Sequence, residues 1–313
     1  MPAGARIAAV AGVRPERVVD NAELGAGLGV PPPWIERRVG VRERRFAGPG
    51  ESVTAMAAAA GGKALAAAGL SPDQVDVLLL ATCSMPSPMP SGAASVAALL
   101  DVPHTAAFDL NAACAGFCYA LATADGLLRS GTSRCALVIG AERMTDWVDP
   151  SDVDTATVFA DGAGAAVVVP ADTPGVHPVV WGGDGDQASL VTIPDRYSSV
   201  AMRGQAVYRW VVTELAEVAE AACARAGITP SELRGFVPHQ ANLRMIERLA
   251  AALGVDEAAV ARDIVETGNT SAASVPLALS RLIDLGRLRS GDPVLLLGFG
   301  AGLSYAAQVI NCP

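Results

Sequence analysis

Three side chains of this 313-residue chain combine useful chemistry with similar sequence surroundings. Cys114 stands among small residues in NAACAGF, His239 follows the apolar segment GFVP, and Asn269 lies in the loop GNTS. Each is expected where a strand or loop ends and an amphipathic helix begins. Together, a thiol, an imidazole and a carboxamide could attack a carbonyl carbon and hydrogen-bond the resulting oxyanion.

Cys114 follows a segment, 108–110, that is typical of the end of a buried strand. A thiol at a helix N-terminus lies beside unpaired N–H groups and the positive end of the helix dipole, which favour the thiolate. We therefore predict a nucleophile. The alternative is a small hydrophobic core residue. The chain has five other cysteines, with no CxxC pair and no Cys/His cluster, so neither a zinc site nor a disulfide framework is expected: Cys83, Cys118, Cys135, Cys223 and Cys312.

His239 and Asn269 each also have a simpler interpretation. A histidine at a strand end can be structural, and an asparagine before a helix can be its cap. The other two histidines, His104 and His177, lie beside prolines in expected connections. The run Gly-Asn-Thr-Ser leaves the backbone accessible, which a cap alone does not explain. Because sites in open α/β sheets assemble where strands end, we expect Cys114, His239 and Asn269 to meet.

The elements that must position these residues are those of a large α/β protein. Hydrophobic residues make up 51% of the chain, charged residues 18% and aromatic residues only 4%, which is typical of close-packed soluble proteins. A formal charge of −9 argues against a nucleic-acid binder. No segment offers about 18 consecutive apolar residues, and the first apolar run is too short for a signal peptide. We expect a cytoplasmic protein that does not enter a membrane.

Two internal similarities divide the chain into halves. ALAAAGLSPDQVDVLLLATCS (64–84) matches ACARAGITPSELRGFVPHQAN (222–242), 158 residues later, and LLRSGTSRCALVIGAE (127–142) matches RLRSGDPVLLLGFGAG (287–302). Apolar strands separated by helices predict parallel sheets covered on both faces, hence a layered αβαβα body with halves 1–170 and 171–313. The alternative is chance similarity in an Ala/Gly-rich chain. The halves align Cys114 roughly with Ser274, so equivalent loops should meet at one site.

Six ordered motifs across nearly the whole chain resemble those of the ketoacyl-acyl-carrier-protein synthases III of the thiolase superfamily. They are PPWIERRVGVRERRFA (32–47), NAACAGF (111–117), FADGAGAAVV (159–168), VPHQANLRMI (237–246), GNTSAASVPLAL (268–279) and GFGAGLSYAA (298–307). The resemblance implies an α/β fold of the duplicated, thiolase-like αβαβα type. It also implies that Cys114 is the acylated nucleophile and that His239 and Asn269 promote decarboxylation of a malonyl thioester.

The same resemblance assigns further residues. It implies that the backbone N–H groups of Cys114 and Ala301 hold the oxyanion. The implied substrate contacts are Trp34 and Arg38 with the adenine and phosphates of coenzyme A, Asn242 with the pantetheine arm, and Gln205, Tyr208 and Phe299 along the binding site. Gln205, Tyr208 and Val153 stand where many members have asparagine, phenylalanine and arginine, so donor contacts are only partly retained. The segment 170–200 is shorter than usual, which leaves acyl-chain length open.

The implied reaction has two halves and needs no metal or redox cofactor. Acyl-CoA acylates Cys114 and releases coenzyme A; then malonyl-acyl carrier protein loses CO2, and its enolate attacks the acyl group to give a 3-oxoacyl thioester. This reaction starts a fatty-acid or polyketide chain. The alternatives are acyl transfer to a hydroxyl or amine, condensation with a CoA-linked extender, and a silent partner subunit. Asn269 favours condensation, because simple acyl transfer needs no decarboxylation pair.

Two macromolecular partners are expected. An acidic carrier protein needs a local basic patch on this acidic chain, which Arg209, Arg244 and Arg248 could supply, although scattered arginines also suit a solvated surface. The loop CSMPSPMPSGAAS (83–95) is expected at a homodimer interface, where the resemblance implies that Met89 reaches the partner's acyl pocket. Prolines on both sides of Met89 would hold this exposed apolar side chain rigidly.

Overall fold

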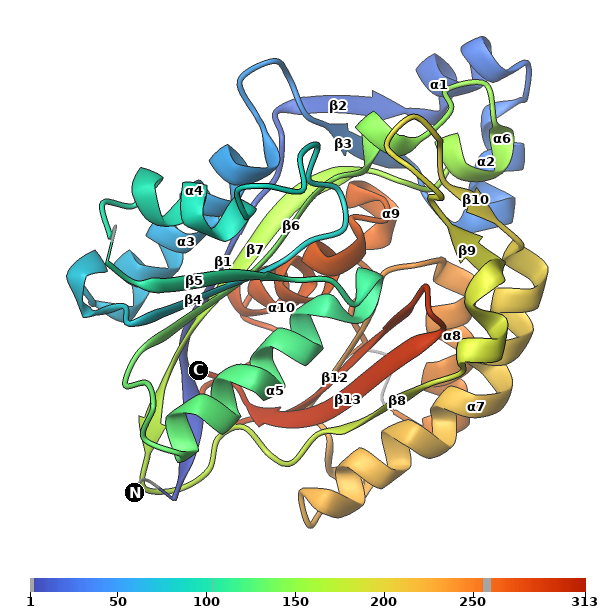
Figure 1. Ribbon diagram of the computed structural model, residues 1–313. Coiled ribbons are helices and arrows are strands. Elements are labelled where there is room, and N and C mark those ends of the chain that lie inside the picture. The colour runs from blue at the N-terminus through green and yellow to red at the C-terminus, as the bar shows by residue number, and fades with distance from the viewer. Residues whose placement is uncertain (1–2, 103, 256–259) are drawn as a thin grey trace.

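The computed structural model describes residues 3–102, 104–255 and 260–313, which form two main β-sheets with helices between and outside them (Figure 1). The five-stranded sheet has the order β1 (Gly4–Val13), β7 (Asp161–Ala171), β6 (Ala136–Arg143), β4 (Val77–Ala81) and β5 (Ala106–Leu110). The four-stranded sheet has the order β11 (Gly235–Pro238), β12 (Pro293–Gly300), β13 (Ser304–Asn311) and β8 (Val180–Gly183). Two small ribbons pair β2 (Arg17–Asp20) with β3 (Glu43–Phe46), and β9 (Val191–Thr192) with β10 (Ala201–Met202).

Helices make up the other three layers. The α-helices are α1 (Asn21–Leu28), α2 (Pro32–Val39), α3 (Val53–Ala68), α4 (Gly92–Leu99), α5 (Gly116–Arg129), α6 (Val153–Ala156), α7 (Gly204–Arg225), α8 (Leu243–Leu253), α9 (Ile264–Thr267) and α10 (Ser274–Asp284). Short 3-10 turns are η1 (Pro72–Gln74), η2 (Ala113–Ala115), η3 (Met144–Trp147), η4 (Gly185–Leu190), η5 (Pro230–Glu232) and η7 (Ser271–Ala273).

The layer order follows from which apolar residues pack together. Helices α5 and α10 share one core with strands of both sheets, so they form the central layer. Helices α3 and α4 cover the outer face of the five-stranded sheet, and α7 and α8 cover the outer face of the four-stranded sheet. In β4, Leu79 faces the central layer while Leu78 and Leu80 face the outer one. Burial on both faces explains why the strand is apolar throughout, and the layered αβαβα fold is confirmed.

The internal similarity corresponds to a structural duplication. Turns η1 and η5 begin 158 residues apart, each carries a capping box, and strands β4 and β11 follow them. Turns η2 and η7 begin at the same spacing and lead into α5 and α10. The offset therefore aligns Cys114 with Ala272 rather than with Ser274, which is the small correction that the structure makes to the alignment.

Wholly parallel sheets were the wrong expectation. Strands β4, β5 and β6 are parallel, as are β11 and β12, whereas β1, β7, β8 and β13 pair antiparallel with their neighbours. Only three residues, 301–303, join β12 to β13, and a parallel pair needs a crossover of about a dozen residues or more. The short GFGAG turn thus forces a hairpin.

Strand β5 is also not the buried strand that its sequence suggested. It is the outermost strand of the five-stranded sheet, and the Phe108 side chain is 41% exposed. An edge strand has a neighbouring strand on one side only, so its other side and the side chains next to it are left open to solvent. Within the described residues, no helix combines the length and the apolar character that crossing a bilayer requires.

Candidate active site

The three reactive residues lie at one cavity of about 960 Å³ built from both halves. Cys114 lies on η2 between β5 and α5, His239 directly follows β11, and Asn269 lies between α9 and η7. All three line the cavity. The sequence therefore correctly placed these residues at strand and helix ends, and the fold brings them together.

Cys114 faces the cavity from a crowded position. Its predecessor, Ala113, has a left-handed backbone (φ 45°), and the end of β12 lies directly against the cysteine. A Cβ on Gly300 would lie only 2.7 Å from the Cys114 Cβ and 3.1 Å from its sulfur. Only glycine allows this approach, because atoms that close would force one of the two loops to move.

The expected resting thiolate is not what this environment favours. Burial raises the pKa of the Cys114 thiol to about 12, although a hydrogen bond with Ser271 and the residue's own backbone N–H oppose the increase. The Glu142 carboxylate adds to the rise. The thiol is therefore neutral in the free site, because desolvation outweighs the partial charges at the start of η2.

His239 is held so that one ring nitrogen remains for the cavity. Its backbone N–H donates to the Leu297 carbonyl (2.7 Å), and its Nδ1 lies 2.7 Å from Ser274 Oγ. The Phe299 ring packs edge-on against the imidazole, with 5.2 Å between ring centroids. Burial lowers the pKa of His239 to about 3, so the ring is neutral. When the Ser274 hydroxyl donates to Nδ1, Nε2 carries the hydrogen and can donate into the cavity.

Asn269 is fixed in a similar way. Its backbone bridges to Phe159, with the Asn269 N–H donating to the Val158 carbonyl (2.9 Å) and the Ala160 N–H donating to the Asn269 carbonyl (2.9 Å). Its side-chain Oδ1 accepts the Ser271 N–H at 2.8 Å. The amide oxygen is thus occupied, which leaves the Nδ2 hydrogens as donors toward the cavity.

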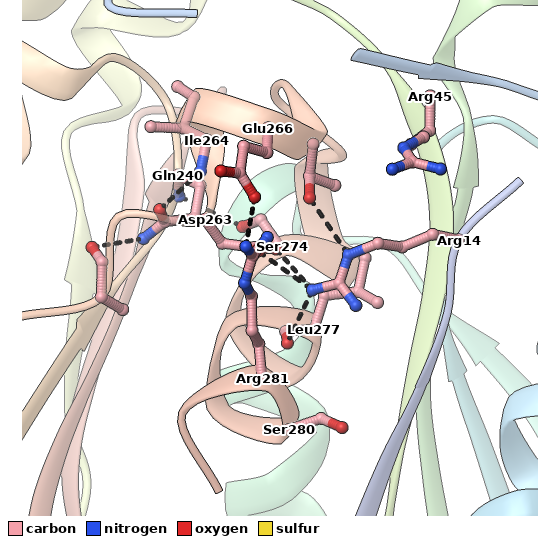
Figure 2. A network of polar contacts seen from close by, with 12 residues as sticks. Arg14, Arg45, Gln240, Asp263, Ile264, Glu266, Ser274, Leu277, Ser280 and Arg281 are labelled. Carbon is pink, nitrogen blue, oxygen red and sulfur yellow. Dashed lines mark hydrogen bonds and ion pairs between the residues drawn. The ribbon is translucent and has the colours of Figure 1, made fainter. Parts of the chain in front are cut away.

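A buried polar network sets the spacing between the His239 and Asn269 loops (Figure 2). Gln240 accepts the Ile264 N–H on α9 at 3.1 Å and donates to the Pro238 carbonyl at 2.7 Å. Directly after β1, the Arg14 guanidinium donates to Thr267 Oγ1 and to the Asp263 carboxylate, at 3.1 and 2.9 Å. The first half of the chain thus holds α9, the helix that leads into Asn269.

The other predicted site residues divide into two groups. Eight line the same cavity: Arg38, Gln205, Tyr208, Arg209, Asn242, Arg244, Phe299 and Ala301. The other three, Trp34, Met89 and Arg248, are not among the residues that line the cavity. Trp34 instead lies beside its mouth, where the Arg38 guanidinium is 5.0 Å from the centre of the indole ring.

Three of the residues at the cavity mouth already have protein partners: Arg38, Asn242 and Arg244, whose guanidinium donates to the Arg37 carbonyl. Arg38 forms an ion pair with Asp154, at a place where the sequence suggested only that Val153 replaces an arginine. Asn242 uses its Oδ1 to cap α8 through the Arg244 N–H (2.9 Å) and its Nδ2 to bond the Arg38 carbonyl (3.4 Å). A phosphate or amide ligand at this mouth would have to compete with these contacts.

Met89 and Arg248 lie on the surface. Met89 is 82% exposed, in the loop between β4 and α4, and Arg248 is exposed on α8. The sequence interpretation also assigned no side-chain role in the site to three buried polar residues, Glu142, Ser271 and Ser274. The sequence did hold a signal for Glu142, because it is the first charged residue after the apolar run ALVIGA. No group of three or more His, Cys, Asp or Glu side chains suited to a metal ion occurs among the described residues.

Comparisons with known proteins agree with the motifs. Residues 108–185 match the family model described as 3-oxoacyl-[acyl-carrier-protein (ACP)] synthase III, and residues 223–312 match the model for its C-terminal region. The chain is 50% identical to β-ketoacyl-[acyl-carrier-protein] synthase III 2 of Streptomyces avermitilis, over 99% of both chains. It is 49% identical to synthase III 4 of Streptomyces coelicolor, over 100% of both chains.

Two solved structures of β-ketoacyl synthases have a fold similar to that of this chain. The priming β-ketosynthase of a polyketide biosynthetic pathway superposes with a TM-score of 0.96 and 42% identity, covering 100% of this chain and 97% of the other. The 3-oxoacyl-(acyl carrier protein) synthase III of Pseudomonas aeruginosa superposes with a TM-score of 0.95 and 36% identity, covering 99% and 98%. The fold, the sequence and the cavity thus lead to the same group of proteins.

Proposed function

The chain belongs to the 3-oxoacyl-[acyl-carrier-protein] synthase III family, and from that premise we propose how its cavity carries out the condensation that starts an acyl chain. The protein is an enzyme of the condensing and acyltransferase class. In the proposed reaction an acyl-CoA acylates Cys114, and decarboxylation of malonyl-acyl carrier protein then supplies the carbon nucleophile. The observation that carries the proposal is that one cavity presents Cys114 together with His239 and Asn269, whose other polar atoms are occupied.

In the first half-reaction the Cys114 sulfur attacks the thioester carbonyl, and coenzyme A leaves. The developing oxyanion needs fixed donors. The Cys114 N–H lowers the pKa of its own thiol, and Ala301 lies in the turn that borders the cavity. The backbone N–H groups of these two residues are the proposed oxyanion hole. Donors of this kind typically contribute about 100-fold or more to the rate each.

In the second half-reaction the malonyl group loses CO2 and leaves negative charge on its thioester oxygen. His239 Nε2 and Asn269 Nδ2 are the proposed donors to that oxygen, since both residues line the cavity and their other polar side-chain atoms are engaged. A neutral imidazole suits this role, because it donates without first binding a proton. The enolate carbon then attacks the acyl group on Cys114, and the 3-oxoacyl thioester leaves.

Substrates are proposed to enter between α7 and α8. Gln205, Tyr208 and Asn242 border this path, and Trp34 with Arg38 lies at its outer end for the adenine and phosphates of coenzyme A. Arg209, Arg244 and Arg248 are the proposed contacts for the acidic carrier protein, of which Arg209 and Arg244 line the mouth itself. No metal or redox cofactor is part of the proposed reaction.

The acylation step can be tested by intact mass. The wild-type protein incubated with a panel of acyl-CoAs should gain the mass of one acyl group, and Cys114→Ala should gain none. Cys118→Ala is the matched control: Cys118 is buried in the central core one helical turn away, and the variant should still acylate. If the Cys114→Ala variant still gained the mass of an acyl group, another residue would be the nucleophile, and the proposal would be contradicted.

The second substrate requires its own test. Charge reversal in Arg244→Glu or Arg209→Glu should raise the KM for malonyl-carrier protein while acylation by a short acyl-CoA changes little, because steering acts on the charged partner. Arg248→Glu, farther from the mouth, should have a smaller effect. Efficient turnover with malonyl-CoA alone, unaffected by Arg244→Glu, would instead favour the CoA-linked extender.

A homodimer is proposed through the free edge of β5. Phe108 on that strand and Met89 on the nearby loop are both exposed apolar side chains, and an uncovered edge strand readily pairs with another strand. A second copy on this edge would cover Phe108 and bring a Met89 to each partner.

A further inference from the structure

One buried carboxylate next to the nucleophile has no role in the reaction described so far. Glu142, near the end of β6, has no exposed surface. Its carboxylate accepts hydrogen bonds from Thr82 Oγ1 (3.0 Å), Ser84 Oγ (2.5 Å) and Ser271 Oγ (3.0 Å). It also accepts from the Cys83 N–H (3.1 Å), the Cys83 thiol (3.3 Å) and the Ala272 N–H (3.4 Å).

None of these six donors carries a charge, so hydrogen bonds alone stabilise the ionised form. The neighbouring Arg143 does not neutralise the Glu142 carboxylate, because its guanidinium pairs with Asp146 and donates to the Gly48 carbonyl. A buried carboxylate without a cation is costly, and burial raises the pKa of Glu142 accordingly. A carboxyl group in this position can accept a proton far more easily than a solvated one.

Ser271 connects this carboxylate to the nucleophile. Its hydroxyl donates to Glu142 Oε1 at 3.0 Å and lies 3.6 Å from Cys83 Sγ. The same side chain lowers the pKa of the Cys114 thiol, so it also lies beside that sulfur. A hydroxyl has one hydrogen and two lone pairs, so Ser271 can donate to Glu142 while it accepts from the Cys114 thiol. The Ser271 backbone is left-handed (φ 46°), and its N–H donates to Asn269 Oδ1, which anchors the residue in the turn next to Cys114.

We propose that Glu142 takes the Cys114 proton through Ser271 during acylation, stores it in the acyl-enzyme, and returns it when condensation releases the thiolate. In acylation the S–H bond breaks, Ser271 passes its own hydrogen to Glu142 and receives the thiol's, and sulfur bonds to the acyl carbon. Coenzyme A leaves as a thiolate and takes its proton from solvent. In condensation the C–S bond breaks, and the same path run in reverse restores the thiol. This inference rests on the proposed function.

The charge balance is the physical reason for such a relay. A neutral thiol and a carboxylate become an acyl thioester and a neutral carboxylic acid, while the negative charge leaves with coenzyme A. Glu142 is then uncharged when the malonyl enolate forms, so two negative charges never share the buried site. His239 cannot take the proton as easily, since burial depresses its pKa and Nδ1 is engaged by Ser274.

The test compares thiolate formation with acylation. The titratable groups that face the relay are Cys83, Cys114 and Glu142, with His239 across the cavity. In Glu142→Gln a negative charge near the thiol disappears, so the pH midpoint for alkylation of Cys114 by iodoacetamide should move down. Single-turnover acylation by acetyl-CoA at pH 7 should nevertheless fall about 100-fold, the usual size of a general-base contribution. A merely electrostatic or structural Glu142 predicts that both reactions become faster together, which would overturn the relay.

Two further variants keep the test decisive. Ser271→Ala leaves the carboxylate in place but interrupts the path, and its acylation should also fall about 100-fold; unchanged acylation would refute the relay even if Glu142→Gln does not fold. Asp161→Asn removes a second fully buried carboxylate, held by Thr145 and the Ala47 N–H, and should acylate normally. If wild-type protein acylates but neither variant slows, only the relay fails; if the wild type does not acylate, the proposed function fails with it.

Discussion

Two loops of this molecule have nearly the same backbone but different chemistry. Ala113 in the first half and Ser271 in the second are 158 residues apart, and both are left-handed, with φ of 45° and 46°. Each begins a 3-10 turn that leads into a helix of the central layer, η2 into α5 and η7 into α10. The first loop presents a thiol to the cavity, and the second is preceded by the Asn269 carboxamide.

The difference shows that duplication supplied the geometry and substitution supplied the chemistry. The residue equivalent to Cys114 is Ala272, which packs so tightly that a Cβ on Gly140 would lie 2.4 Å from its carbonyl oxygen. The sheets differ too: β5 closes the first sheet, whereas the described residues at the corresponding edge of the second sheet include the isolated bridge between Phe236 and Val260.

The largest expected effect is a loss of condensation without a loss of acylation when the second half of the chain is mutated. His239→Ala and Asn269→Ala should still form the acyl-enzyme but lose condensation by about 100-fold or more, because their donors serve the enolate and not the first attack. Intact mass would show acyl-enzyme that persists after malonyl-carrier protein is added. If either variant failed to acylate while remaining folded by circular dichroism, the division of labour between the halves would be wrong.

The next effect concerns the extra edge strand of the first half. Phe108→Glu places a charge on the exposed edge of β5, so the proposed dimer should dissociate to monomers at micromolar concentration, as measured by light scattering. Leu285→Glu is a matched control, because that leucine is 60% exposed at the end of α10 in the second half. A wild-type protein that is already monomeric, or a Phe108→Glu variant that stays dimeric, would contradict this interface.

A smaller effect concerns the pH response of the second half. With a pKa of about 3 when folded against about 6.5 when unfolded, His239 binds protons more readily in the unfolded chain, so it lowers stability as pH falls through this window. Between pH 7 and 5 the loss from this group is about 2 kcal/mol. Urea unfolding of His239→Asn should show a correspondingly weaker decline. Cys114 adds nothing there, since its thiol is neutral in both states. An equal decline in both proteins would show that His239 is not the titrating group.

The smallest effect compares the two left-handed residues directly. Ala113→Gly relieves a conformation that costs an L-residue about 1 kcal/mol and adds a similar chain-entropy cost, so stability should change little. Ser271→Gly makes the same backbone change but also removes the hydroxyl bonded to Glu142, which should cost about 1 kcal/mol more. Urea unfolding at pH 7 measures both. Equal stabilities would mean that the Ser271 hydroxyl contributes nothing to the fold.

The sequence by itself determined the repeat, the layered α/β architecture and the positions of Cys114, His239 and Asn269 at strand and helix ends. These features depend on local periodicity, glycine and proline turns and a fixed offset, all of which are visible along the chain. The strand directions were only partly predictable, since a run of apolar residues does not reveal whether its neighbour runs parallel or antiparallel.

Only the tertiary structure decided which groups in the site are buried and which hydrogen bonds and ion pairs they form. The neutral state of Cys114 depends on burial by segments from both halves, and the Glu142–Ser271 contact joins residues 129 positions apart. The Asp154 partner of Arg38 and the Ser274 partner of His239 are likewise distant in sequence, by 116 and 35 positions. Desolvation and hydrogen-bond geometry arise from packing in three dimensions, so residue spacing along one chain cannot specify them.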